Sequence, residues 1–148
     1  MFAAILVGTD GSDTATTAVR YAIDLARELG ARLHIVSAYE PVPADRLRRE
    51  GLEVPKDLEW SINPREDVLE LLENAGREAQ SVGVAEVQTF ARQGDAADAI
   101  LDVAEEQLTD LIVVGNKGMT GAKRFLLGSV PNKVSHHAPC SVLIVRTT

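Results

Sequence analysis

Residues 111–137 read LIVVGNKGMTGAKRFLLGSVPNKVSHH, and this stretch decides the fold class. It opens with the apolar run from Leu111 to Val114, which has the length and composition of a buried parallel strand. A glycine-containing segment follows, and a helix is predicted from Ser129 to His137. A strand, a loop and a helix in this order form the building unit of α/β proteins.

The same alternation extends along the rest of the chain. Further strands are predicted at residues 2–8, 33–39, 86–92 and 142–145, and further helical patterns at 13–29, 68–82 and 95–107. Ser12 or Asp13 can cap the first helix, and Gly30 stands where a helix end favours glycine. Residues 41–64 are rich in proline and charge and show no sustained period, which predicts a long variable loop.

Five strands alternating with four helices require right-handed crossover connections, so the strands should run parallel. We therefore expect a single α/β domain over residues 1–148, with an open Rossmann-like sheet covered by helices on both faces. The 148 residues are 45% apolar and 25% charged, which suffices for one core.

Charge is distributed unevenly along the sequence. The chain has a net charge of −7, yet all 22 acidic residues lie at or before Asp110, and residues 111–148 hold five basic residues and no acidic one. A small positively charged region suits a compact anionic ligand, whereas a long nucleic acid normally requires a broad basic face. The charge pattern thus predicts a small anion as ligand and no nucleic acid as partner.

The sequence also predicts a cytoplasmic protein with no membrane partner. Its apolar runs fall far short of the roughly 18 residues that a membrane helix needs. The amino terminus lacks the positive region and cleavage site of a secretory signal. Cys140 is the single cysteine, so no internal disulfide can form, which is typical of a reducing compartment.

Glycines after the fourth predicted strand are spaced as a phosphate site requires. Gly115 and Gly118 permit close backbone approach, and Gly128 leads directly into the helix that begins at Ser129. Lys117 and the later pair Lys123 and Arg124 add positive charge. The Ser129 hydroxyl can donate to a phosphate oxygen. The alternative is a purely structural loop, in which glycines serve only tight turns.

A second loop, Gly8–Ser12, follows the first predicted strand. Open parallel sheets bind ligands beyond the carboxyl ends of their strands, so the two loops should share one crevice if their strands are neighbours. Phosphate contacts of about 1.5–3 kcal/mol each barely offset the estimated 4–15 kcal/mol cost of association. A base held between Val7, Ala38 and Val114 would add affinity. Asp10 is a candidate to bind ribose hydroxyls or Mg²⁺, or simply to cap the helix.

Common catalytic motifs are absent from the sequence. It contains no Walker loop, no Gly-x-Gly-x-x-Gly after the first strand, and no metalloprotease or hydrolase-elbow motif. No clear general base lies near the predicted phosphates, which favours holding a nucleotide over consuming it. Two alternatives remain open. One is a slow ATPase or nucleotidyl transferase, with Asp10 holding Mg²⁺ and Ser129 or Lys117 at the transferred group; the other is a dimeric interaction module.

Three motifs together resemble the universal stress protein family. They are Gly115-x2-Gly118-x9-Gly128-Ser129, the sequence VGTDGS at residues 7–12, and HHAPCSVLIV at residues 136–145. The likeness runs from Ile5 to Val145, and the glycine motif is typical of the ATP-binding branch. The resemblance implies a five-stranded parallel sheet in the order 3-2-1-4-5.

The resemblance also implies a binding site for an adenine nucleotide in a stress-response sensor or regulatory module. Near the adenosine it implies Gly8, Thr9, Asp10 and Ala38. Along the phosphates it implies Val114, Gly115, Lys117, Gly118, Gly128, Ser129 and Val130. Some family members with a similar Gly-Ser-Val-Pro segment bind cyclic AMP, so both ATP and cyclic AMP are candidate ligands, with Mg²⁺ arriving through the nucleotide.

A homodimer is expected through the last strand, residues 142–145. The resemblance implies this pairing, because family members usually form dimers through that strand. The sequence supports it separately, since an apolar edge strand exposes unpaired backbone groups that a second copy can cover.

Overall fold

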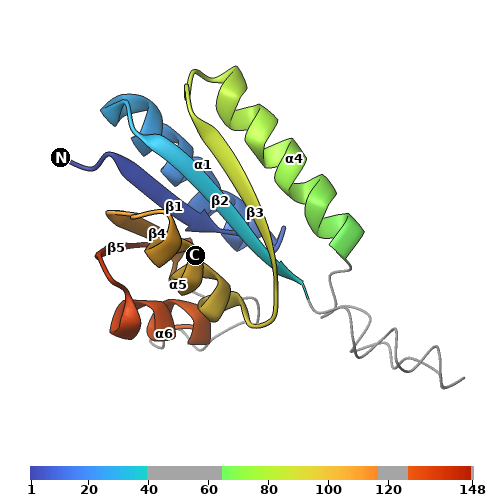
Figure 1. Ribbon diagram of the computed structural model, residues 1–148, viewed down its shortest axis with the longest axis vertical. Coiled ribbons are helices and arrows are strands. Elements are labelled where there is room, and N and C mark those ends of the chain that lie inside the picture. Colours follow the sequence, from blue (N-terminus) through green and yellow to red (C-terminus); the bar gives the residue numbers. More distant parts are fainter. Residues whose placement is uncertain (40–64, 117–126, 148) are drawn as a thin grey trace, which may run out of the picture.

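The structure, a computed structural model, describes residues 1–39, 65–116 and 127–147, so the predicted loop at 41–64 lies outside the described residues (Figure 1). Its strands are β1 (Ala4–Gly8), β2 (Arg32–Tyr39), β3 (Val87–Gln93), β4 (Leu111–Gly115) and β5 (Ser141–Val145). They form one sheet in the order β3-β2-β1-β4-β5, and every pair is parallel. The predicted α/β fold and strand order are confirmed.

The helices are α1 (Asp13–Leu29), α4 (Arg65–Ser81), α5 (Ala96–Glu106) and α6 (Ser129–His137). Each coincides with a helical pattern in the sequence to within a few residues. At the start of α1, Ser12 rather than Asp13 is the cap, because its hydroxyl accepts from the backbone N–H of Ala15 at 3.3 Å. At its end, Gly30 adopts the left-handed conformation expected of a helix-terminating glycine.

Two cores lie on the two faces of the sheet. Helices α1 and α4 pack on one face, where Ile5, Val7 and Leu33 are buried, and α5 and α6 pack on the other, where Leu6 and Val36 are buried. Successive residues of a strand point to opposite faces, so neighbours in β1 alternate between the cores. Figure 1 shows the sheet between these helices.

The strand order reverses between β1 and β4. In the register of the sheet, Val7 of β1 lies beside Val113 of β4, and Gly8 lies beside Val36 of β2. From β1 the chain adds β2 and then β3 on one side, and it places β4 and then β5 on the other side of β1. The carboxyl ends of β1 and β4 therefore form the kind of switch point where open α/β sheets bind ligands.

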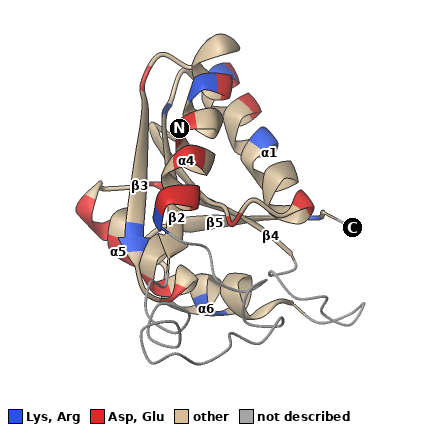
Figure 2. Cartoon of the chain, turned by 90° about the vertical axis from the view of Figure 1, so that its right-hand side faces the viewer, with Lys and Arg blue, Asp and Glu red and all other residues tan. Residues whose placement is uncertain are grey.

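Acidic residues are concentrated on three of the four helices that the structure describes. Figure 2 shows them on α1, α4 and α5, whereas α6 carries none. In the described part of the chain, no helix combines the length and the apolar character needed to cross a membrane. Among the described helices, the one without carboxylates is thus the helix that begins at the switch point.

Candidate functional site

The tip of β1 is held close to helix α5. Thr9 donates its backbone N–H to the carbonyl of Val36 at 3.0 Å, which continues the β1–β2 pairing by one residue. A Cβ placed on Gly8 would lie 2.6 Å from Cδ1 of Ile100 in α5, closer than a real contact allows. Glycine at this position therefore lets the helix approach the strand end and fixes where the following turn begins.

Asp10 shapes the turn between β1 and α1. Its Oδ1 accepts from the backbone N–H of Ser12 at 3.0 Å and from the Ser12 hydroxyl at 2.6 Å. Gly11 adopts a φ of +83°, and its N–H donates to the Thr9 hydroxyl at 3.1 Å. These contacts give Asp10 a structural part in the helix entry. Nowhere in the described residues do three or more metal-binding side chains gather.

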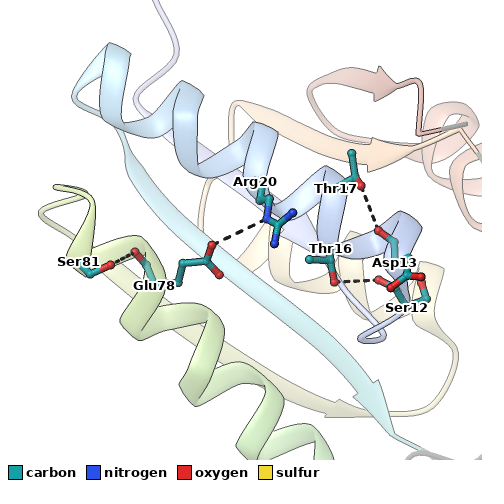
Figure 3. A network of polar contacts seen from close by, with 7 residues as sticks. All are labelled: Ser12, Asp13, Thr16, Thr17, Arg20, Glu78 and Ser81. Carbon is teal, nitrogen blue, oxygen red and sulfur yellow. Dashed lines mark hydrogen bonds and ion pairs between the residues drawn. The ribbon is translucent and has the colours of Figure 1, made fainter.

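Side-chain hydroxyls at the start of α1 bond to the helix's own backbone. Figure 3 shows Thr16 donating its hydroxyl to the carbonyl of Ser12, at 2.9 Å, and Thr17 donating to the carbonyl of Asp13, at 3.1 Å. Further along, Arg20 reaches Glu78 of α4 at 4.0 Å. Because Ser12 also caps the helix, this start has side-chain partners of its own.

The start of α6 differs, because its N-cap residue is Gly128 and, among the described residues, no side chain caps its first N–H groups. The first residues of a helix have no acceptor within the helix, and Pro131 contributes no N–H. Ser129 is exposed, Val130 is half-buried and Gly128 is buried. The first turn contains no acidic residue. Free donors at the positive end of a helix are the usual backbone site for an anion.

Asn116, which sequence reasoning did not select, joins this helix start to the end of β5. Its carbonyl accepts from the N–H of Gly128 at 3.0 Å, and its own N–H donates to the carbonyl of Val145 at 2.8 Å. Its side-chain Oδ1 accepts from the N–H of Thr147 at 2.8 Å and from the Thr147 hydroxyl at 3.0 Å. The signal available in the sequence was an asparagine directly after a strand, a residue type that readily bonds to nearby backbone.

The proposed base-binding residues divide between the two cores. Ala38 is half-buried and packs on the α5 side of the sheet, where Val114 is also buried with 4% of its surface exposed. Val7 is fully buried on the α1 side. The expectation that Val7 joins Ala38 and Val114 around a base is therefore wrong, because strand alternation points its side chain to the opposite face.

The structure describes only part of the positively charged region at residues 111–148. Lys117 and Gly118 of the predicted phosphate loop lie outside the described residues, together with the basic pair that follows them. Lys133 in α6 pairs with the carboxylates of Asp98 at 2.7 Å and Asp95 at 3.4 Å. It therefore ties α6 to the start of α5, and its charge is balanced there.

A hollow of about 610 Å³ lies at the opposite, amino-terminal end of β2 and β3, lined by Arg32, Gln88 and Glu106 among others. His34 also lines it, is only 4% exposed, and has no hydrogen-bond partner for its Nδ1 within the described part of the chain. Burial, and to a lesser degree the charge of Arg32, lowers the pKa of His34 below its ordinary value. The hollow is separate from the switch point.

Comparison with known proteins supports the family read from the motifs. A family model described as the universal stress protein family matches residues 1–146. Universal stress protein Rv1636 from Mycobacterium tuberculosis is 38% identical over 144 residues, covering 97% of this chain and 96% of that protein. Universal stress protein YxiE from Bacillus subtilis is 38% identical over 149 residues, covering 99% and 100%.

A solved structure of similar shape is described as a universal stress protein in complex with cAMP. It matches with a TM-score of 0.73 and 31% sequence identity, covering 99% of this chain and 98% of that one. The family model and the curated relatives span nearly the full chain, and the observed strand order is the one that the motifs implied. This chain therefore belongs to the universal stress protein family.

Proposed function

We propose that this chain binds an adenine nucleotide between the tips of β1 and β4 and acts as a sensor or regulatory module in a stress response. The observation that carries the proposal is the start of α6 at Gly128, a residue without a capping side chain, in the next described element after β4. It offers backbone donors and no carboxylate at the end of the sheet where ligands bind.

The rest of the nucleotide is assigned to the glycines and small side chains at this edge. We assign the adenosine to Gly8, Thr9, Asp10 and Ala38. We assign the phosphates to Val114, Gly115, Lys117, Gly118, Gly128, Ser129 and Val130. Val114 is buried, so its part would be played by the backbone. Mg²⁺ would arrive with the nucleotide near Asp10, whose Oδ1 already accepts two bonds from Ser12.

ATP and cyclic AMP are the two candidate ligands. The similarity to a family member in complex with cAMP supports the second, and the glycine motif of the ATP-binding branch supports the first. Parallel calorimetric titrations with ATP, with and without Mg²⁺, and with cyclic AMP test the proposal. We expect dissociation constants in the micromolar range, about −8 kcal/mol, for at least one ligand. Heats indistinguishable from buffer at millimolar concentrations of both would contradict it.

We propose that the site holds the nucleotide rather than hydrolysing it. Asp10 is the carboxylate nearest in sequence to the β1 tip, and its engagement with Ser12 makes it a poor general base. Incubation with MgATP should therefore give phosphate release no faster than the no-protein control. Magnesium-dependent turnover that disappears in Asp10→Ala would instead favour a slow ATPase.

We also propose a cytoplasmic homodimer formed through β5. This strand pairs with β4 on one side and is the last strand of the sheet, and Leu143 and Ile144 are 38% and 39% exposed. A second copy would cover these side chains and the unpaired edge. Sedimentation should give a dimer for the wild-type chain and a monomer for Ile144→Lys. An Ile144→Lys variant that still sediments as the wild type would place the interface elsewhere.

A further inference from the structure

One residue contacts both the start of α6 and the end of the edge strand β5. Asn116 follows β4 directly and takes part in four hydrogen bonds, of which one reaches Gly128 and three reach Val145 and Thr147. These four bonds use three separate groups of Asn116: its backbone N–H, its backbone carbonyl and its side-chain Oδ1. We propose that Asn116 couples nucleotide binding at the α6 start to pairing of β5 with a second copy of this chain.

The bond to Gly128 sets where α6 begins. Gly128 is the N-cap residue, so its position determines where the free donors of the first helical turn point. Its N–H donates to the Asn116 carbonyl at 3.0 Å, across eleven intervening residues of the chain. A shift of Asn116 therefore shifts the cap, and with it the donors that would face a phosphate.

The bonds to Val145 and Thr147 set where the β5 edge ends. Val145 is the last residue of β5, and Thr147 follows two residues later. Both donors on Thr147 meet the same atom, Oδ1 of Asn116, which fixes the amide orientation because the amide nitrogen cannot accept. A second copy that pairs along β5 would hold this segment in one conformation, and Asn116 would pass that order to Gly128.

The coupling rests on the proposed function, and it must be reciprocal. Because the dimer would hold one site on each copy, pairing that improves nucleotide affinity at each site by some factor requires saturating nucleotide to strengthen pairing by the square of that factor. We expect the dimer dissociation constant of the wild-type chain, measured by sedimentation, to fall about fivefold or more when ATP or cyclic AMP is saturating. The nucleotide dissociation constant per site should differ by the square root of that factor between protein concentrations below and above the dimer midpoint.

Two variants of Asn116 separate the effect of its accepting oxygen from the effect of an added charge. Asn116→Ala removes Oδ1 and should abolish the nucleotide-induced shift in pairing, whereas Asn116→Asp keeps an accepting oxygen and should retain it. The added charge of Asn116→Asp should weaken nucleotide binding near the phosphates, so the shift is measured at saturation. Ser135→Ala removes an exposed hydroxyl on α6 that donates to the carbonyl of Asn132, and serves as the matched control. An undiminished shift in Asn116→Ala would overturn the proposal.

Hydrogen exchange tests the same link without any ligand. In Asn116→Ala, the Thr147 amide loses its side-chain acceptor and should exchange faster. If Asn116 joins the two regions, the Gly128 amide should lose protection as well, although its own backbone acceptor is unchanged. Unchanged protection at Gly128 would overturn the coupling. A wild-type chain that binds neither ATP nor cyclic AMP would contradict the proposed function, and the Gly128 result would then decide the link by itself.

Discussion

Helices α1 and α6 both begin at the carboxyl edge of the sheet, but their first turns differ. At α1, Ser12 caps the helix and is in turn held by Asp10, so the chain supplies its own acceptors. At α6, Gly128 occupies the same position and offers no side chain. The capped start of α1 shows that the fold does not require an uncapped helix at this edge, so the glycine at the start of α6 needs an explanation other than the fold.

The largest effect is expected from giving α6 a cap like that of α1. Gly128 has φ −62° and ψ 163°, an extended conformation that other residues can adopt, so we expect Gly128→Asp to fold. Its carboxylate would accept from the first N–H groups and repel phosphates. Losing two charge-assisted bonds should lower ATP or cyclic AMP affinity at least about 100-fold, measured by calorimetry.

A matched control places the same charge at the other end of α6. Ser135 is exposed, and we expect Ser135→Asp to keep nucleotide affinity within about threefold, because helix-end charge effects fall off within a turn. Circular dichroism should confirm that both variants fold. Wild-type affinity in a folded Gly128→Asp protein would mean that the α6 start does not hold the phosphates.

The next effect concerns the position of the β1 tip, from which α1 begins. Gly8→Ala would force its Cβ against Ile100, and overpacking of this kind costs about 1–3 kcal/mol of stability. Ile100→Val removes the Cδ1 atom that lies closest to the added group. Urea unfolding of the two single variants and the double variant should show that the double variant is more stable than the sum predicts. Strict additivity would show that the contact does not limit the residue at position 8.

A smaller effect is expected from removing the cap of α1. Ser12→Ala leaves the Ala15 N–H without its side-chain acceptor and should lower the free energy of unfolding by about 1 kcal/mol, within a range of about 0.5–2. Thr17→Ala, which removes an exposed hydroxyl one turn further into the same helix, should change stability by less than about 0.5 kcal/mol. Equal losses in the two variants would mean that Ser12 contributes as an ordinary surface residue.

The smallest expected effect is the pH dependence of stability caused by His34, which lies away from both helix starts. It has to be corrected for when the helix starts are studied at different pH values. Burial and Arg32 lower the pKa of His34 below 6.5, against an opposing effect of Glu86, so the folded chain resists protonation. Below about pH 6.5 the unfolded chain gains a proton first, and stability should fall as the pH decreases from 7 towards 5.5. His34→Gln should show a smaller decrease in urea unfolding midpoints. Superimposable pH profiles would exclude His34 as the source.

The sequence predicted the fold well because its local signals agree. The continuous apolar runs, the helical spacings, Ser12 and Gly30 all describe elements that the structure contains. The order of the strands required the family motifs, since periodicity does not say which strands are neighbours. The mistake at Val7 came from treating the end of a strand as one surface, when alternate residues face different cores.

The candidate site was predicted less completely. Glycine spacing selected the start of α6, but it did not distinguish the roles of Gly8 and Gly128. Gly8 lacks a Cβ and so packs closely against Ile100, whereas Gly128 lacks a side chain that could cap α6. Asn116 was missed because its partners Gly128 and Thr147 are 12 and 31 positions away, and no local pattern connects them.

The contacts of Thr147 also affect how the protein should be handled. A purification tag fused after this residue would lie next to its two hydrogen bonds to Asn116. Immobilisation on a sensor surface through such a tag would put strain on these two bonds. Met1 is fully exposed and precedes β1, so it leaves the molecule at the amino edge of the sheet. Immobilisation through an amino-terminal tag would therefore present the switch point to the solution and leave the Asn116 contacts undisturbed.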